Sequence, residues 1–164
     1  MRAIVISFTL TMFVAAAVAQ QAGNQALKTY ASSADVAALI SKARSERQPN
    51  QATVTEPILQ FAPYRAMLEY RTAVGPAAIH EREAEVFYVI DGSGTLVTGG
   101  KLVGESRSNA DNLTGTAIQG GVSRKVAKGD FIVVPETVPH WFSAIDGTLI
   151  MMSMHVPRPV PAAH

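Results

Sequence analysis

Two stretches of the sequence indicate the fold: His80-Glu-Arg-Glu-Ala-Glu85-Val-Phe-Tyr-Val-Ile-Asp-Gly92 and Gly129-Asp-Phe-Ile-Val-Val-Pro135-Glu-Thr-Val-Pro139-His140. The first places one histidine and three glutamates within six residues, then continues as an apolar strand that closes in a glycine turn. The second is an apolar strand that stops at one proline and reaches its histidine directly after another. Imidazole and carboxylate groups are common metal ligands, so a histidine at the edge of each strand predicts one shared site.

The sequence after Gln51 alternates short runs rich in Val, Ile, Thr, Tyr and Phe with Gly or Asn/Asp turns. Many short runs at this spacing indicate an all-β sandwich or barrel, not alternating strands and helices. The polar stretch 104–112 is expected to be a loop. The expected strands are 54–61, 64–72, 77–81, 85–91, 95–98, 116–119, 123–127, 131–135, 141–145 and 148–156.

One helix is predicted before the strands, over residues 33–46. The run Ser32-Ser33-Ala34-Asp35 offers a hydroxyl at the cap position and a carboxylate that can reach back to the backbone, as in a capping box. Apolar residues follow at helical spacing, so one face of the helix should pack on the outside of the barrel. These residues are Val36, Leu39, Ile40 and Ala43.

The first stretch resembles the first sequence motif of the cupin superfamily, whose members are small double-stranded β-helix barrels, also called jelly rolls, that often carry a metal. Glu85, six intervening residues and Gly92 match the end of that motif. His80 takes the place of the second of its two histidines, and Ala78 stands where the first should be. The resemblance therefore implies the barrel fold but leaves one family ligand missing.

The second stretch resembles the second cupin motif, a glycine, five residues, a proline, a turn of four residues and a histidine. Gly129, Pro135 and His140 match it, while Thr137 replaces the usual turn glycine. The resemblance covers about residues 60–157. It implies the fold much more specifically than an activity, because one fold hosts many unrelated chemistries.

Residues 1–19 are expected to be a signal peptide, because Arg2 precedes an apolar run and Ala17-Val18-Ala19 has the small-x-small pattern of a signal-peptidase site. A retained anchor is less favoured, since the run is short for a span of about 20 apolar residues. The mature chain would then be periplasmic or secreted, with no membrane partner after cleavage. It would comprise an N-terminal extension (20–52), a barrel domain (53–157) and a flexible proline-rich tail (158–164).

Composition limits the partners. Without Arg2, the 14 Lys and Arg residues become 13, equal to the 13 Asp and Glu residues. A neutral chain without a basic patch argues against a nucleic-acid partner. The chain has no cysteine and hence no disulfide, so it must rely on its core or on oligomerisation. The family resemblance and the apolar strands near both ends of the barrel domain favour a homodimer.

The predicted metal ligands are His80, Glu85 and His140, a set of two imidazoles and one carboxylate that leaves positions open on the ion. A divalent ion is expected, with iron or manganese favoured and zinc or nickel as alternatives. Two other arrangements stay open. Glu81 or His155 could complete a set of four ligands, or the histidines could be relics in a metal-free barrel that binds an organic molecule.

Three further residues are predicted to contact a small-molecule substrate or ligand: Arg82, Phe142 and His155. Arg82 shares strand parity with His80, so it could point inward and hold a carboxylate; a surface contact with Glu81 or Glu83 is the alternative. Either Phe142 or its neighbour Trp141 should face the interior, because adjacent residues of a strand point to opposite sides.

The sequence supports two classes of function. One is a metal-dependent oxygenase or isomerase that acts on a small oxygenated substrate, with the metal activating dioxygen or acting as a Lewis acid. The other is a sensor or storage barrel that binds a small molecule without turnover. A structural protein would need only the core. The sequence contains no nucleophile elbow, phosphate loop or cofactor fingerprint that would choose among them.

Overall fold

The computed structural model describes residues 27–158, so the predicted signal peptide and most of the predicted tail lie outside the described residues. One helix, α1 (Ser33–Glu46), precedes the strands of this part of the chain. The strands are β1 (Thr53–Phe61), β2 (Tyr64–Arg71), β3 (Ala77–His80), β4 (Glu83–Thr98), β5 (Lys101–Val103), β6 (Ser106–Arg107), β7 (Asn112–Gly115), β8 (Ala117–Gln119), β9 (Val122–Ala127), β10 (Phe131–Val134) and β11 (His140–Pro157).

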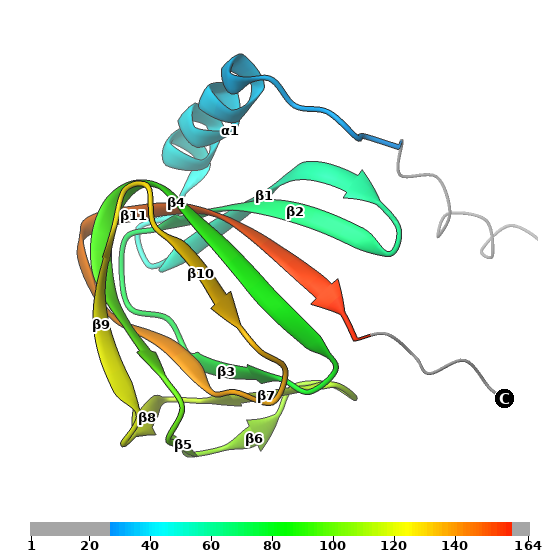
Figure 1. The fold of residues 1–164 in the computed structure, drawn as a ribbon. Coiled ribbons are helices and arrows are strands. Elements are labelled where there is room, and N and C mark those ends of the chain that lie inside the picture. Colours follow the sequence, from blue (N-terminus) through cyan, green and yellow to red (C-terminus); the bar gives the residue numbers. More distant parts are fainter. Residues whose placement is uncertain (1–26, 159–164) are drawn as a thin grey trace, which may run out of the picture.

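Helix α1 begins at the predicted cap. The backbone N–H of Asp35 donates to Oγ of Ser32 at 3.1 Å, and the Asp35 carboxylate accepts from the Ser32 backbone at 2.8 Å. The helix lies outside the barrel, across β1 and β2 (Figure 1). Its apolar face closes a cluster of buried residues on the outer side of these strands: Ala43, Val54, Ile58, Ala66, Leu68, Tyr70 and Ile150.

Two long strands, β4 and β11, pair antiparallel along most of their length and carry the rest of the barrel. The sequence analysis was wrong to divide each of them into two strands separated by a turn. Gly92 is instead a bend within β4, with a φ of 82°. A Cβ on Gly92 would overlap the carbonyl oxygen of Thr148, so only glycine allows the two bent strands to approach this closely. Gly147 likewise lies within β11.

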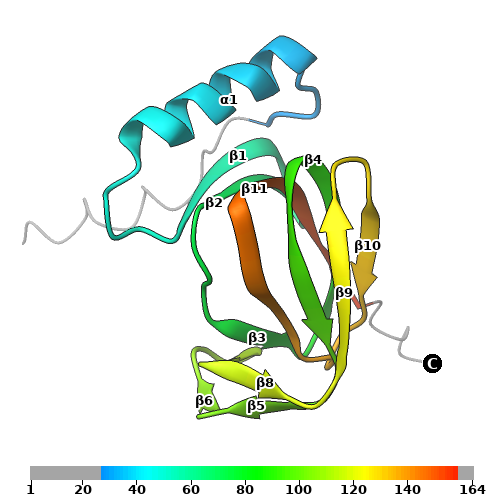
Figure 2. The ribbon, with the colours of Figure 1, turned by 90° about the vertical axis from the view of Figure 1, so that its left-hand side faces the viewer.

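The bends carry β4 and β11 from one side of the barrel to the other (Figure 2). The first half of β4 pairs with β10, and the second half of β11 pairs with β2. The remaining half of β4 pairs with β9, and β11 meets β3 at His140. The structure is therefore an all-β double-stranded β-helix with one external helix, as predicted.

The interior of the barrel holds a second apolar cluster. Its buried members come from the inward-facing positions of β4, β9, β10 and β11: Phe87, Val89, Leu96, Val126, Val134, Phe142, Leu149 and Met151. The side chain of Met151 is fully buried there. Among residues 27–158, no helix is long and apolar enough to cross a membrane.

The stretch 104–112, expected to be a loop, contains the short strand β6 and ends in β7. Ser106 pairs with Thr114 and Arg107 with Leu113. The polar composition concealed this pairing because β6 is an edge strand whose two residues are both exposed. The segment matters for function, because β7 pairs with β3 and begins opposite His80.

Substitutions of two neighbouring valines of β10 test which face of this strand lies inside the barrel. Val134 is 2% exposed inside the barrel, whereas Val133 is 64% exposed on its outer face. Val134→Asp should lower the free energy of unfolding by about 3 kcal/mol or more, because it buries an unpaired charge. Val133→Asp should change it by less than about 0.5 kcal/mol. Urea unfolding of both variants checks this, and equal losses would contradict the assignment of the two faces.

Candidate metal centre

Four side chains meet inside the barrel, although they are far apart in the sequence. His80 ends β3, and Glu85 is the third residue of β4. His140 and His155 lie near opposite ends of β11 and enter the interior together because that strand passes from one side of the barrel to the other. His155 is directly opposite Glu85 in the strand register.

The three imidazoles are directed at the Glu85 carboxylate. Nε2 of His140 lies 3.0 Å from Oε2 of Glu85, and Nε2 of His80 lies 3.2 Å from the same oxygen. Nε2 of His155 lies 3.3 Å from Oε1. Both oxygens of the Glu85 carboxylate thus contact imidazole nitrogens. In all three histidines, Nε2 is the nitrogen that faces the carboxylate.

Asn112 on β7 orients the first histidine. Its Oδ1 lies 2.6 Å from Nδ1 of His80, and its Nδ2 donates to Oδ1 of Asn109 at 3.0 Å. The contact with Asn109 fixes which end of the amide faces the ring. Nδ1 of His80 therefore donates to an acceptor, and Nε2 is the nitrogen directed at the centre.

The other two histidines also have an acceptor near Nδ1. Nδ1 of His140 lies 3.5 Å from the carbonyl oxygen of Val138. Nδ1 of His155 lies 2.7 Å from Oε2 of Glu83, at ion-pair distance but without the direction of a hydrogen bond. Each ring is therefore placed with Nε2 toward Glu85 and Nδ1 toward an oxygen. The short hydrogen bond that usually holds the second nitrogen of a metal-ligating histidine is formed at His80.

The turn before His140 is fixed from β3. The backbone N–H of Thr137 donates to the carbonyl oxygen of His80 at 2.8 Å. Thr137 has a φ of 66°, a region that favours glycine and strains a β-branched residue. This position is the one where the second cupin motif has its turn glycine, so the backbone keeps that turn in spite of the substitution.

The electrostatics of the cluster favour an ionised carboxylate. Burial alone would raise the pKa of Glu85, but hydrogen bonds from His140, His155 and His80 outweigh it and hold that pKa well below its usual range. Burial would lower the pKa of His80, yet the hydrogen bonds to Glu85 and Asn112 raise it. The pKa of His155 is raised by its hydrogen bond to Glu85, against the effect of burial.

The donor set fits a divalent metal ion. One ligand atom each from His80, Glu85 and His155 lies within 4.8 Å of the other two, and Nε2 of His140 is in contact with the same carboxylate. Imidazole nitrogens with one carboxylate suit iron, manganese, nickel or zinc. Glu85 and His140 are nearly inaccessible, whereas the side chains of His80 and His155 are 17% and 24% exposed. Solvent therefore reaches the cluster from the side of these two histidines.

Comparison with known proteins agrees with the fold and the motifs. The sequence model described as "Cupin" matches residues 49–159, more than half of the chain. The chain belongs to the cupin family. No curated protein sequence matches this cupin significantly.

Solved structures resemble this cupin at low sequence identity. KdgF from Halomonas sp. is 17% identical, with 69% of this chain and 87% of that chain covered and a TM-score of 0.49. An iron(II) form of HppE is 16% identical, with a TM-score of 0.49; the match covers 67% of this chain but only 53% of that one. A protein from Ralstonia eutropha described as a mannose-6-phosphate isomerase by inference is 15% identical, with 67% and 87% covered and a TM-score of 0.48.

The structure brings His80, Glu85 and His140 together and adds His155, which the sequence analysis assigned to substrate, with a fourth metal ligand as the alternative. Arg82 does not face the interior. Its side chain is 77% exposed, and its Nε lies 2.9 Å from Oδ1 of Asp111 on the surface. The expectation of an inward Arg82 is therefore wrong, because the residue follows the end of β3, where strand parity no longer applies.

Two other candidates lie away from the four-residue cluster. Glu81 is turned outward and binds Arg107, with Nη1 and Nη2 at 2.7 and 3.1 Å from its two oxygens. Of the neighbours Trp141 and Phe142, it is Phe142 that faces the interior. Its side chain is part of the barrel core and only 3% exposed. Its ring packs edge-on against Phe87, and their centroids are 5.4 Å apart.

Sequence reasoning missed Asn112, which orients His80, and Glu83, which lies at ion-pair distance from His155. Asn112 lay at the end of an expected loop, and no motif spacing relates it to His80. Its strand β7 pairs with β3 across 32 residues of sequence. Glu83 belongs to the acidic run that opens the first motif, but its partner lies on β11. The only available signal was the excess of carboxylates beside one histidine.

The contact between Asn112 and His80 can be tested alone. Asn112→Leu should lower metal affinity by about 10- to 100-fold, because Nδ1 of His80 loses the acceptor that orients the ring. Asn112→Asp keeps an oxygen at this place and should retain most of the affinity. Competition with a chelator of known affinity measures both. Equal affinities in wild type and Asn112→Leu would show that Asn112 does not position the histidine.

Proposed function

We propose that this cupin holds one divalent metal ion through His80, Glu85, His140 and His155. The observation that carries the proposal is the convergence of three imidazole Nε2 atoms on one buried carboxylate, at 3.0, 3.2 and 3.3 Å. A carboxylate with a low pKa, three Nε2 atoms directed at it and a His80 ring oriented through Nδ1 form a site prepared for a cation.

The fourth ligand replaces the histidine that the first cupin motif lacks in this chain. Ala78 offers no donor at that position and pairs with His140 across the strands. His155 instead approaches from β11, opposite Glu85. The sequence thus supplies three imidazoles and one carboxylate, although one imidazole comes from a different strand. Four protein ligands leave two positions open on a six-coordinate ion.

The proposed metal is iron or manganese, with zinc or nickel as alternatives. Mixed imidazole and carboxylate ligands without thiolate suit these ions. Such an ion, when bound, would supply Lewis acidity or a site for dioxygen. We propose that the reaction is that of an oxygenase or isomerase on a small oxygenated substrate. A sensor or storage barrel that binds a small molecule without turnover is the alternative.

The residues around the centre have separate roles in this proposal. Asn112 keeps the ring of His80 in place, and Glu83 lies at ion-pair distance from Nδ1 of His155. Phe87 lies with its ring centroid 6.1 Å from that of His140, and it is 1% exposed, so it closes the inner side of the centre to water. A substrate would therefore arrive from the more exposed side, next to His80 and His155.

The proposal extends to location and assembly. Export to the periplasm or the medium is supported by the apolar run and the small-x-small pattern in residues 1–19. A homodimer is supported by the apolar side chains left on the outer face of the barrel, of which Phe131 is 76% exposed. The partner of the metal centre would be a small molecule rather than a nucleic acid.

Metal affinity of single variants tests the ligand set. His80→Ala, Glu85→Gln, His140→Ala and His155→Ala should each lower affinity by at least about tenfold, because each removes one donor. Glu81→Gln is the matched control and should bind like wild type, since Glu81 contacts Arg107 on the surface. Elemental analysis after dialysis and calorimetric titration with Mn²⁺ give the values. Wild-type affinity in His155→Ala would reduce the set to three ligands, and full metal content in Glu85→Gln would contradict the proposal.

A further inference from the structure

Strand β10 is an open edge of the barrel. Among the strands that the structure describes, it pairs with β4 alone, so one side of its backbone faces no other strand (Figure 2). Its four residues, Phe131 to Val134, include neither a charged residue nor a proline. An exposed apolar edge of this kind is a place where a strand of another chain can be added.

The three other edges of the large sheet are protected. Strand β9 also pairs with β4 alone, but it carries the exposed charged residues Arg124 and Lys125. The outer side of β1 is covered in part by the N-terminal segment, where Lys28 forms a bridge with Gln60. Strand β6 is only two residues long and includes Arg107. Charges, covering segments and short length usually protect an edge strand, and β10 has neither a charge nor a cover.

The free hydrogen-bonding groups and the exposed side chains of β10 belong to the same two residues. The backbone N–H of Val89 donates to the carbonyl oxygen of Asp130 at 2.9 Å. Residues of an antiparallel strand alternate in the side to which their backbone groups point, so Ile132 bonds β4, whereas Phe131 and Val133 point away from it. The side chains of Phe131 and Val133 are also 76% and 64% exposed.

The outward side chains of β10 continue as an apolar patch onto β4. The rings of Phe131 and Tyr88 are in contact, with their centroids 4.6 Å apart and their planes inclined by 37°. Val133 is opposite Val86 in the strand register. An aromatic pair and a valine pair thus lie side by side on the outer face, next to the open edge.

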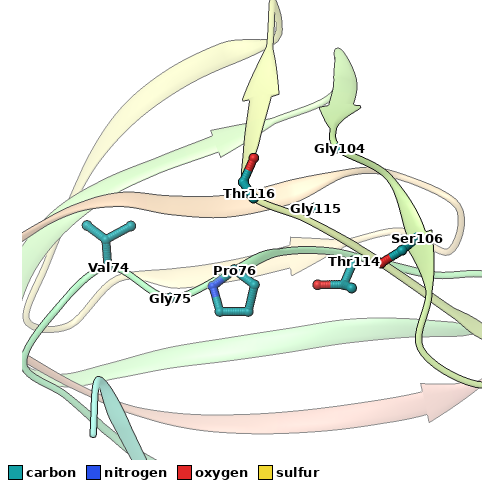
Figure 3. A pocket seen from close by; sticks show the side chains of 8 residues that line it. All are labelled: Val74, Gly75, Pro76, Gly104, Ser106, Thr114, Gly115 and Thr116. Atoms are coloured by element: carbon teal, nitrogen blue, oxygen red, sulfur yellow. The ribbon is translucent and has the colours of Figure 1, made fainter. Parts of the chain in front are cut away.

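The groove of the barrel is a separate feature. It has a volume of about 420 Å³ and is formed by the connection between β2 and β3 and by the segment around β6 and β7 (Figure 3). It is lined by Val74, Gly75, Pro76, Gly104, Ser106, Thr114, Gly115 and Thr116. These residues belong neither to β4 nor to β10, so a small molecule in the groove does not account for the apolar patch.

We infer that a second copy of this chain adds its own β10 antiparallel to this edge. The edge is self-complementary about Ile132, because a two-fold axis there places Phe131 of each copy opposite Val133 of the other. Opposite residues of this type exchange both of their N–H···O bonds, and their aromatic and β-branched side chains form cross-strand pairs. The inference rests on the homodimer of the proposed function and adds the surface that forms it.

Charges beyond the two ends of β10 favour the antiparallel direction. Lys128 precedes the strand and Glu136 follows it, and their side chains are 72% and 31% exposed. An antiparallel pair brings the start of one strand beside the end of the other, so unlike charges approach. A parallel pair would bring like charges together. The contacts of Lys128 with Asp91 at 3.5 Å and of Glu136 with Arg158 at 3.4 Å are surface ion pairs, which are weak.

Sedimentation equilibrium of the full mature protein at micromolar concentration tests the inference. Wild type should have twice the mass of one chain. Val133→Asp should have the mass of one chain, because it places a charge beside Phe131 of the other copy on both sides of the axis. The barrel of this variant should stay folded, since Val133 faces outward, and thermal melting checks this.

Val122→Asp is the matched control. Val122 lies on the other edge strand beside β4 and is also 64% exposed, but β9 has no part in the proposed interface. This variant should remain a dimer. A dimeric Val133→Asp, or loss of the dimer in both variants, would overturn the inference.

Amide hydrogen exchange measured by NMR tests the strand pairing itself. The N–H of Phe131 points at the second copy in the dimer, whereas the N–H of Ile132 bonds β4 in either state. Exchange at Phe131 should be at least about tenfold slower in wild type than in Val133→Asp, and exchange at Ile132 should change less. Equal rates at Phe131 would show that the dimer forms without this pairing and would overturn the inference.

The failure of this inference can be told apart from the failure of the proposed function. A dimer that persists in Val133→Asp contradicts the use of β10 but leaves the homodimer in place. A monomeric wild type contradicts both. The four proposed ligands lie outside β10, so metal content measured on the same samples tests the metal centre independently of either result.

Discussion

The burial of one carboxylate is the constraint on which the site depends. Glu85 is 5% exposed, and a charged group at such a place destabilises the fold unless opposite charges or donors surround it. Three imidazoles meet this requirement in the protein, and a metal ion would meet it more fully. The same residues therefore stabilise the barrel and prepare the centre. Removing a single imidazole leaves the carboxylate partly unpaired, so folding and metal binding are linked at this position.

The pairing of β4 with β11 is what makes this arrangement possible. The two strands remain in register from His140 opposite Thr98 to His155 opposite Glu85, with shifts at the bends. Because β11 contributes to both sides of the barrel, it delivers one histidine from each side. Gly92 permits the close approach of the strands at the bend in β4. A fold constraint far from the four proposed ligands thus determines whether those side chains can meet.

The sequence predicted the features that depend on local spacing. The helix cap at Ser32, the barrel class and the meeting of His80, Glu85 and His140 follow from short motifs. The features that depend on pairing across many residues were not predictable. His155 was considered as a substrate contact or a fourth ligand, but nothing in the sequence states that it lies opposite Glu85. Asn112 was likewise placed at the end of a loop.

The two arginines show the same limit in another form. Arg82 was predicted to contact substrate because it shares strand parity with His80, yet β3 ends at His80 and Arg82 turns to the surface. Arg71 carries no motif, and its place beside Glu69 inside the barrel follows only from strand register and the ion pair between them. Distance along the sequence is therefore a poor guide to the lining of a barrel, whereas strand parity is reliable only within a continuous strand.

The central claim is that Glu85 and three imidazoles form one metal centre, and a crystal structure of the manganese-loaded protein tests it most directly. Anomalous diffraction locates the ion independently of the surrounding atoms. Our account predicts one strong peak within coordinating distance of a Glu85 oxygen and of the Nε2 atoms of His80, His140 and His155. A peak bound elsewhere, or no peak at Glu85 in crystals grown with excess manganese, would contradict it.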